Sequence, residues 1–307
     1  KCFYCGSPIT KRNGFKNRVQ MYKCHNCGKQ FVGGTRIDPL KLWQEYLYNK
    51  QTYKEIAIRY GISESTVKRR IRLICEEWYQ SIPKRTGYIL LDTTYFGRNW
   101  GVLVAMDVQS GKVVYRKYIR HERITDYVEC VSILENNGFI IKGIVIDGMR
   151  GLFQVLSKYP VQMCQFHQCA ILRRYLTQNP KLQAGKELLG LSKKLAQSNK
   201  ENFVNQFTQW ELKWEDFLNE RSRNPITEKS YYVHKKLRSA ARSLRTNMKY
   251  LFIYQEDKNK GLPNTNNKLE GTFTDLKKNL NNHSGMSKEN RKRFINGFFK
   301  ALGDTTT

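Results

Sequence analysis

Acidic residues are scarce in this chain of 307 residues, which has 26 Asp and Glu against 54 Lys and Arg. The formal net charge is therefore +28, and the basic residues are spread along the whole chain. A surplus of this size disfavours an ordinary metabolic enzyme. It also exceeds what solubility requires, since mixed signs or extra acid serve solubility better. The natural counter-ion for such a surface is the phosphate backbone of a nucleic acid.

Long apolar runs are also missing, because no stretch approaches the ~18 consecutive residues that a membrane-spanning helix needs. No signal-peptide pattern stands ahead of the first motif, although the chain begins with Lys1 and not with Met. We therefore expect no membrane partner. The eight cysteines are spaced as metal ligands are, which favours a reducing cell interior over an extracellular disulfide framework.

Residues 1–35 contain two Cys-x-x-Cys pairs separated by eighteen residues. Two pairs at this spacing are a strong signal for a zinc ribbon with four thiolate ligands. Gly6 and Gly28 follow the second cysteine of each pair and suit the tight turn that a metal knuckle makes. His25 lies inside the second pair and is expected to be a bystander. The predicted Zn²⁺ ligands are Cys2, Cys5, Cys24 and Cys27.

Residues 38–80 read as a helix-turn-helix DNA-binding domain. A first helix opens at Thr52, Gly61 supplies the break, and Ser63 can cap a second helix from Glu64 to about Glu77. The second helix has an apolar stripe at helical spacing, and its other face is polar and cationic. An ordinary helical hairpin with a solvated charged face is the alternative. The side chains predicted to contact DNA are Ser65, Thr66, Lys68, Arg69 and Arg72.

Three acidic residues in distinct settings suggest a catalytic centre. Asp92 ends the apolar run Tyr88–Leu91, Asp147 ends the run Ile144–Ile146, and Glu270 lies at the start of a later helical pattern. A single acid at the end of a strand is usually a turn former or a helix cap. Two such acids and one on a helix could together hold a pair of divalent cations for phosphoryl chemistry on DNA. Asp107 and Asp275 are rival acids close by in the sequence.

From residue 86 the apolar runs predict three strands, a helix, a strand, a short helix and a last strand at Val161–Phe166. This is the mixed sheet of a ribonuclease H-like catalytic domain, with residues 86–167 as its first part. An all-helical insertion follows over 168–258, and residues 259–307 return to the catalytic domain with the helix of Glu270. In the insertion, Arg238, Arg242 and Arg245 recur at helical steps and predict a stripe that contacts the DNA backbone. The predicted fold class is thus multi-domain α/β.

The chain resembles the Mutator-like DDE transposases, including related enzymes of bacterial insertion sequences. The matching stretches lie within residues 86–302. They are Leu91-Asp92-Thr93-Thr94, Val145-Ile146-Asp147-Gly148, Cys164-Gln165-Phe166-His167 and Asn267-Lys268-Leu269-Glu270-Gly271. The resemblance implies that Asp92, Asp147 and Glu270 bind two Mg²⁺ or Mn²⁺ ions. The role of Cys164 and His167 stays open between a structural bond, support for the site, and half of a metal site that Cys169 could complete.

These features predict a transposase that binds the ends of a mobile element, cleaves DNA strands and transfers 3′-ends to target DNA. Its expected partners are double-stranded DNA, both terminal inverted repeats and target, and a second copy of the chain on paired ends. The expected location is the cytoplasm of a prokaryotic host, associated with the nucleoid. Two alternatives remain: a non-catalytic DNA-binding regulator derived from a transposase, and a structure-selective nuclease of the ribonuclease H-like fold.

Overall fold

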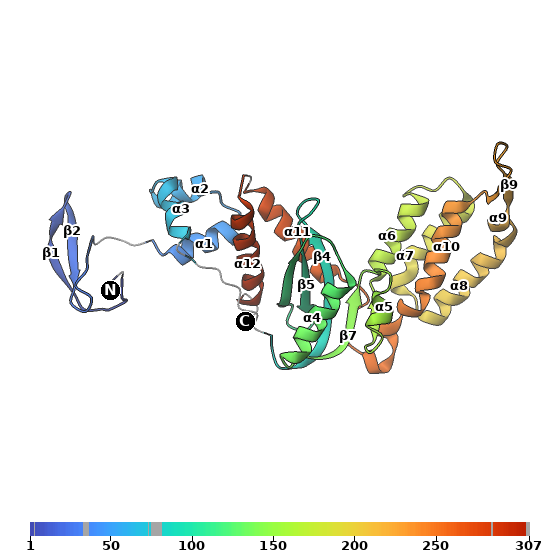
Figure 1. Ribbon diagram of the computed structural model, residues 1–307, viewed down its shortest axis with the longest axis horizontal. Helices are drawn as coiled ribbons and strands as arrows, with labels where there is room; N and C mark the ends of the chain where they lie inside the picture. The colour runs from blue at the N-terminus through green and yellow to red at the C-terminus, as the bar shows by residue number, and fades with distance from the viewer. Residues whose placement is uncertain (3, 33–36, 73, 75–81, 284, 305–307) are drawn as a thin grey trace. The chain divides into compact units, whose positions relative to one another are not determined.

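The computed structural model describes residues 1–307 except 3, 33–36, 73, 75–81, 284 and 305–307, and the chain divides into two compact units. Unit 1 comprises Lys1–Glu76 with Asn282–Gly285, and unit 2 comprises Glu77–Asn281 with Met286–Thr307. Over the described residues the fold is mixed α/β, with twelve α-helices and a mixed five-stranded sheet (Figure 1). The α/β class predicted from the sequence is confirmed.

Unit 1 begins with a small antiparallel sheet. Residues Asn17 and Arg18 both have positive φ and turn the chain between its first two strands. The rings of Tyr22 and Phe31 stack with centroids 5.9 Å apart and give this sheet its small apolar backing. The strands are β1 (Thr10–Lys16), β2 (Val19–Cys24) and β3 (Gln30–Val32), in the order β1-β2-β3.

Three short helices follow in unit 1, namely α1 (Pro39–Tyr48), α2 (Tyr53–Tyr60) and α3 (Glu64–Arg72). The predicted signals are present, because Thr52 and Glu55 form a capping box and Gly61 ends α2 at a φ of +60°. The Ser63 hydroxyl accepts the N–H of Thr66 at 3.2 Å at the start of α3. The described part of α3 ends at Arg72, and most of the predicted extension to Glu77 lies outside the described residues.

His283 completes the core of unit 1 although it comes from the far end of the chain. It is 6 % exposed, and its Nε2 lies 3.1 Å from the Tyr46 carbonyl oxygen in α1. The two rings also pack together, with centroids 4.0 Å apart. Burial lowers the pKa of His283, so its ring enters this core as a neutral, largely apolar group.

The central sheet of unit 2 has the order β6-β5-β4-β7-β8. Strands β4, β5 and β6 form an antiparallel meander, and β7 and β8 continue the sheet in parallel on the other side of β4. Helix α4 packs on β5, β6 and β7, whereas α11 packs on β4 and α12 on β6. The bounds are β4 (Thr86–Tyr95), β5 (Gly101–Asp107), β6 (Val113–Ile119), α4 (Ile124–Asn136), β7 (Ile140–Ile146), α5 (Leu152–Val155), β8 (Val161–Met163), α11 (Asn267–Asn281) and α12 (Lys288–Asp304).

Two predictions about the elements around this sheet are wrong. The last strand ends at Met163 and not at Phe166, because Cys164 already stands at the start of the next helix. The segment after residue 259 contains two helices where one was expected.

The insertion is helical as predicted but not entirely so, because it contains a hairpin of β9 (Arg221–Arg223) and β10 (Ser230–Tyr232). Three-residue strands leave too short an alternation to be read from sequence. The aromatic residues Phe203, Phe207 and Trp210 are buried, as expected for the core of a helical layer. The helices are α6 (Gln165–Leu176), α7 (Gln183–Lys194), α8 (Lys200–Lys213), α9 (Glu215–Asn219) and α10 (Lys235–Asn247).

Candidate functional site

Asp92 lies within β4 and not at its end, which corrects the expectation from the sequence. The strand continues to Tyr95 because it stays paired with β5. On its other side, however, the parallel pairing with β7 reaches only Leu90, so Asp92 stands just beyond the carboxyl end of β7. Side chains alternate along a strand, which places Asp92 on the face of Leu90. Its carboxylate accepts the N–H of Thr93 at 2.7 Å and is almost fully buried.

Asn266 fixes the start of α11, the helix that carries Glu270. Its side-chain amide donates to the Leu91 carbonyl at 3.2 Å, and its backbone N–H donates to the Cys164 sulfur at 3.2 Å. Its own carbonyl accepts the N–H of Glu270 at 3.0 Å. These bonds tie the first turn of α11 to β4 and to the start of α6. Glu270 is thereby held beside Asp92 although 178 residues separate the two in the sequence.

His167, in the first turn of α6, joins these two acids. Its Nε2 lies 3.1 Å from the Glu270 carboxylate. One potential ligand atom from each of Asp92, His167 and Glu270 lies within 4.8 Å of the others, so this group could hold a metal ion. Cys164 contacts Asn266 and influences His167, which favours a supporting role for the pair. Cys169 bonds to the Ser192 carbonyl instead and is not part of the group.

The protonation of the three groups is strongly perturbed. Burial first, and then the neighbouring Glu270, raise the pKa of Asp92 to about 8. Interactions with Cys164 and with Glu270 raise the pKa of His167 to about 10. The hydrogen bond from His167 in turn lowers the pKa of Glu270. Without a cation, the site therefore favours a protonated His167 beside an ionised Glu270, and it disfavours a second negative charge on Asp92.

Asp147 lies at the carboxyl end of β7, as predicted. It is not one of the three residues, Asp92, His167 and Glu270, whose ligand atoms lie within 4.8 Å of one another. Its carboxylate accepts the N–H of Met149 at 3.1 Å, and Gly148 between them has a φ of +108°. The charge of Asp147 still contributes to the raised pKa of Asp92, so the two carboxylates share one edge of the sheet. The structure thus brings Asp92 and Glu270 together and sets Asp147 beside them.

Glu122 is a fourth carboxylate at this edge that the sequence reading missed. Burial raises its pKa, and the charge of Asp147 adds to that effect. The Tyr127 hydroxyl donates to Glu122 and lies 3.2 Å from the Thr93 hydroxyl. Glu122 precedes α4 in the polar stretch Arg120-His121-Glu122-Arg123, where an acid looks like an ordinary loop residue. Only the tertiary contact between Tyr127 in α4 and Thr93 in β4 reveals its position.

The two rival acids do not belong to the site. Asp107 is fully buried at the far end of β5, where it accepts hydrogen bonds from Arg85 and from the Ser110 N–H at 3.0 Å. It stabilises the turn between β5 and β6. Asp275 is exposed on α11, five residues after Glu270 and therefore on another face of the helix. The choice of Glu270 over Asp275 agrees with this geometry.

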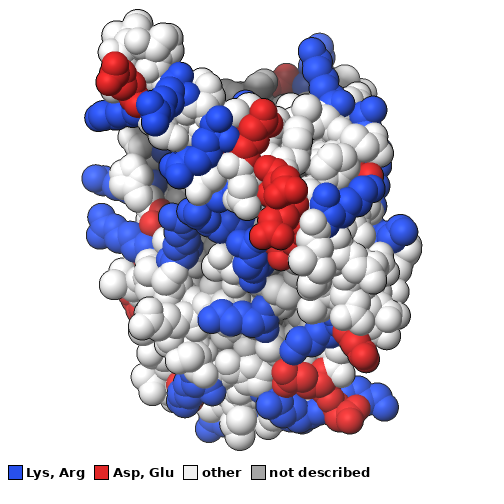
Figure 2. All heavy atoms as spheres, turned by 90° about the vertical axis from the view of Figure 1, so that its right-hand side faces the viewer, with Lys and Arg blue, Asp and Glu red and all other residues white. Residues whose placement is uncertain are grey.

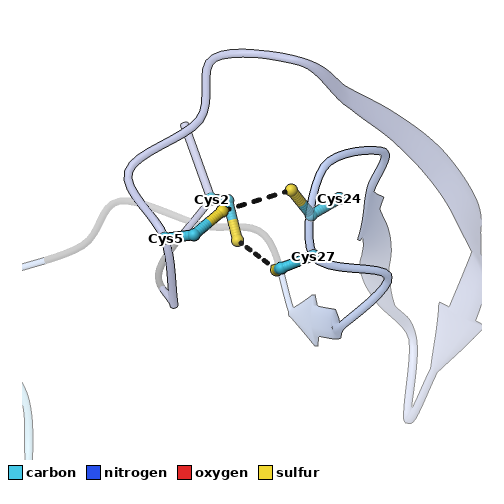
Figure 3. A group of neighbouring side chains, drawn as sticks. All are labelled: Cys2, Cys5, Cys24 and Cys27. Carbon is cyan, nitrogen blue, oxygen red and sulfur yellow. Dashed lines mark hydrogen bonds between the residues drawn. The ribbon is translucent and has the colours of Figure 1, made fainter.

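The four N-terminal cysteines form a second group that could bind a metal ion, and zinc is the ion that suits four sulfur ligands (Figure 3). Their ligand atoms lie within 4.8 Å of one another, with Cys2 and Cys27 sulfurs 3.5 Å apart and Cys5 and Cys24 sulfurs 3.6 Å apart. The N–H of Cys27 lowers the pKa of the Cys24 thiol to about 6, which favours the thiolate that a metal needs. Gly6 and Gly28 have φ of +72° and +68°, as the predicted knuckles require.

The polar face of α3 is available for a partner. Ser65, Arg69 and Arg72 are exposed, and no partner is recorded for them among the described residues. Lys68 is 3.7 Å from Glu64 and also lies over the Tyr53 ring. The hydroxyl of Thr66 contacts Ser63 at the helix start. Of the five predicted contact residues, three thus point freely outward and two have local partners.

The three arginines of the predicted stripe differ in their surroundings. Arg238 donates to the Leu218 carbonyl at 2.6 Å, and Arg245 pairs with Glu211. Arg242 is exposed, with no partner recorded in the described part of the chain. All three line a hollow of about 320 Å³. Figure 2 shows this end of the insertion, where Lys and Arg gather beside a row of acidic side chains. The surface is therefore mixed in charge, and both Arg242 and Arg245 are exposed on it.

No helix in the described part of the chain combines the length and the apolar character of a membrane span. Comparison with protein-family models and with curated proteins finds no match to this chain.

Proposed function

We propose that this protein is a transposase that cleaves DNA strands and transfers 3′-ends by metal-dependent phosphoryl transfer. The observation that carries the proposal is the meeting of Asp92 and Glu270, from opposite ends of unit 2, beside Asp147 at one edge of a mixed sheet. Such a convergence of widely separated acids has no structural purpose in the core, because burying like charges together is unfavourable.

The arrangement of unit 2 supports a ribonuclease H-like catalytic domain. An antiparallel meander extended by two parallel strands, in the order β6-β5-β4-β7-β8, agrees with the fold expected from the sequence. In unit 1, the four-cysteine group supports a zinc ribbon, and α2 and α3 with Gly61 between them support a helix-turn-helix. The large basic surplus supports DNA as the substrate.

The carboxylates of Asp92, Asp147 and Glu270 would hold Mg²⁺ or Mn²⁺, which prefer hard oxygen ligands. A pair of such ions, when bound, stabilises the attacking and leaving oxygens of an in-line displacement at phosphorus. Burial of Asp92 makes its charged form depend on a nearby cation, so the site favours metal binding. His167 holds the Glu270 carboxylate in place through its hydrogen bond.

The test uses DNA that carries the element's own ends, incubated with the full chain and Mg²⁺, with nicks mapped on both strands. We expect nicks at the element boundaries and joining of the freed 3′-ends to a second duplex. Asp147→Asn is expected to abolish nicking and keep DNA binding within about twofold, because an amide is a poor ligand for Mg²⁺. Asp275→Asn removes an exposed acid of α11 and serves as the matched control.

Two results would redirect the proposal. Specific binding without cleavage by the wild-type chain would favour the non-catalytic regulator, against which the presence of all three acids speaks. Cleavage of branched DNA without joining would favour a structure-selective nuclease, against which the helical insertion speaks. Such a compact nuclease has no need of a platform of five helices.

A further inference from the structure

The β9–β10 hairpin stands out from the helical insertion, and nothing in the proposed cleavage chemistry uses it. Its strands pair antiparallel, with Ser230 opposite Arg223 and Tyr232 opposite Arg221. In Figure 1 the hairpin extends clear of helices α9 and α10. An isolated two-stranded ribbon is marginally stable in water, so the surrounding protein has to hold it in place.

The base of the hairpin is firmly anchored to the insertion. His234 stacks on Phe217 with ring centroids 3.7 Å apart, and its Nε2 lies 2.8 Å from the Glu220 carboxylate. Arg238 donates to the Leu218 carbonyl and packs over the Tyr232 ring at 3.6 Å from its centroid. These contacts fix both ends of the ribbon to α9 and α10. The hairpin is therefore a rigid projection and not a loose loop.

The tip of the hairpin has a defined conformation and an exposed apolar side chain. The Asn224 side chain accepts the N–H groups of Ile226 at 2.9 Å and Thr227 at 3.0 Å. Glu228 closes the turn in the left-handed region, at a φ of +51°. Ile226 is nevertheless 90 % exposed, next to the exposed ring of Pro225. An ordered turn that presents isoleucine to solvent calls for a partner that covers it.

The charges along the hairpin identify the kind of partner. Arg221 and Arg223 are exposed on β9, Lys229 is exposed directly before β10, and Glu228 is the one acid between residues 221 and 232. A cationic ribbon with an apolar tip matches the way some proteins bend duplex DNA. Basic side chains contact the phosphates, and an apolar wedge enters between base pairs from the minor groove. A protein partner would favour a broad apolar patch, whereas the exposed apolar side chains of the hairpin, such as Ile226 at the tip and Tyr231 on β10, are interspersed with cations.

We propose that the β9–β10 hairpin is a DNA-bending arm. Arg221, Arg223 and Lys229 contact the phosphates that flank the minor groove, and Ile226 wedges into one base step and kinks the duplex. The inference rests on the DNA-binding part of the proposed function and is independent of strand cleavage. It assigns the insertion a specific task, which is to shape the DNA that unit 2 engages.

The experiment measures affinity and bending of a duplex of about 20 base pairs, roughly 68 Å long, with a fluorophore at each end, using the full chain without Mg²⁺. Energy transfer between the ends reports the bend. Binding of the wild-type chain is expected to increase the energy transfer, because it bends the duplex. Ile226→Ser is expected to abolish this increase and to weaken binding by less than about fivefold, since the phosphate contacts remain. The double variant Arg221→Ala/Arg223→Ala is expected to lower the slope of log affinity against log salt by about 1.8, the value for two phosphate contacts. Ile140→Ser is the control, because Ile140 is likewise an exposed isoleucine, at 64 %, but it lies on β7.

The outcomes separate this inference from the proposed function. Absence of duplex binding by the wild-type chain would overturn both. Binding with an unchanged bend in Ile226→Ser, or an unchanged salt slope in the arginine double variant, would overturn the bending arm alone. A change in the sedimentation of the DNA-free protein caused by Ile226→Ser, with normal bending, would show that the tip contacts protein and would also overturn it.

Discussion

At the scale of single residues, Asp92 lies in a position where a negative charge on its carboxyl group is unfavourable. It is 6 % exposed, and both Glu270 and Asp147 add their negative fields to the effect of burial. A protein selected only for stability would place an amide or an apolar side chain here. The unfavourable carboxyl group is understandable if a cation binds beside it, because the attraction then offsets the burial of charge.

Asp92→Asn is therefore expected to stabilise the metal-free protein at high pH. The pKa of Asp92 is raised from 3.8 to about 8 in the native state. Between these pH values the unfolded chain loses its proton while the native protein keeps it, so stability falls as pH rises through that window. We expect the variant to gain about 1–3 kcal/mol of unfolding free energy at pH 8 and little at pH 4.

Thermal unfolding of unit 2 in a chelating buffer at both pH values measures this effect. Asp275→Asn, which changes an exposed acid, is expected to leave the transition temperature unchanged. An equal stabilisation by Asp92→Asn at pH 4 and pH 8 would contradict the prediction, because a difference in ionisation would then not be its cause.

At the scale of elements, the most reliable predictions came from signals that act locally. The Cys-x-x-Cys pairs, the helix start at Thr52 and the break at Gly61 each depend on neighbouring residues, and the structure contains all three features. Glu122 and the β9–β10 hairpin were missed because only tertiary contacts define them. Likewise, Arg238 looked like a free member of a stripe until its bonds to the base of the hairpin became visible.

The N-terminal sheet is expected to depend on zinc for its folding. Its strands are largely exposed, so the apolar core is too small to offset the loss of chain entropy without a metal. Metal analysis of the purified chain should return about one zinc per molecule. Cys24→Ser should lose that zinc and unfold this sheet while leaving the transition of unit 2 in place. A chain that keeps its zinc after this substitution would refute the assigned ligands.

Helix α3 and the insertion are expected to contact DNA in different ways. Arg69 is exposed on the polar face of a helix that fits the major groove, so Arg69→Ala should reduce discrimination at one base position by about 1–3 kcal/mol. Arg242→Ala should instead weaken binding to all sequences alike and flatten the salt dependence. Affinities for a specific and a scrambled duplex at several salt concentrations distinguish these effects. The same sequence-independent loss from both variants would show that this division is wrong.

At the scale of the whole molecule, the class of fold could be predicted, but which stretches of the chain form each compact unit could not. The alternation of apolar runs indicated the sheet, because each buried strand needs such a run. Nothing in the sequence around His283 indicated that it packs against Tyr46, more than two hundred residues earlier. Pairings at this separation depend on the path of the whole chain.

The proposed joining of two element ends requires two catalytic centres, so we expect two copies of the chain on paired ends. Each copy offers one group of Asp92, His167 and Glu270 among its described residues. Sedimentation with a duplex that carries two ends should show a complex containing two chains, and a single-end duplex should show a smaller one. A single chain bound to the two-ended duplex, with both ends cleaved, would contradict this expectation.

The position of His283 also limits how this protein can be divided by an engineer. Unit 1 is not a continuous N-terminal piece, because it includes Asn282–Gly285 from between α11 and α12. A fragment that stops at residue 76 would leave the face of Tyr46 uncovered and would be a poor donor for a chimeric DNA-binding protein. A graft that keeps the natural recognition unit must therefore carry a surrogate for the imidazole ring, or transplant both stretches of chain together.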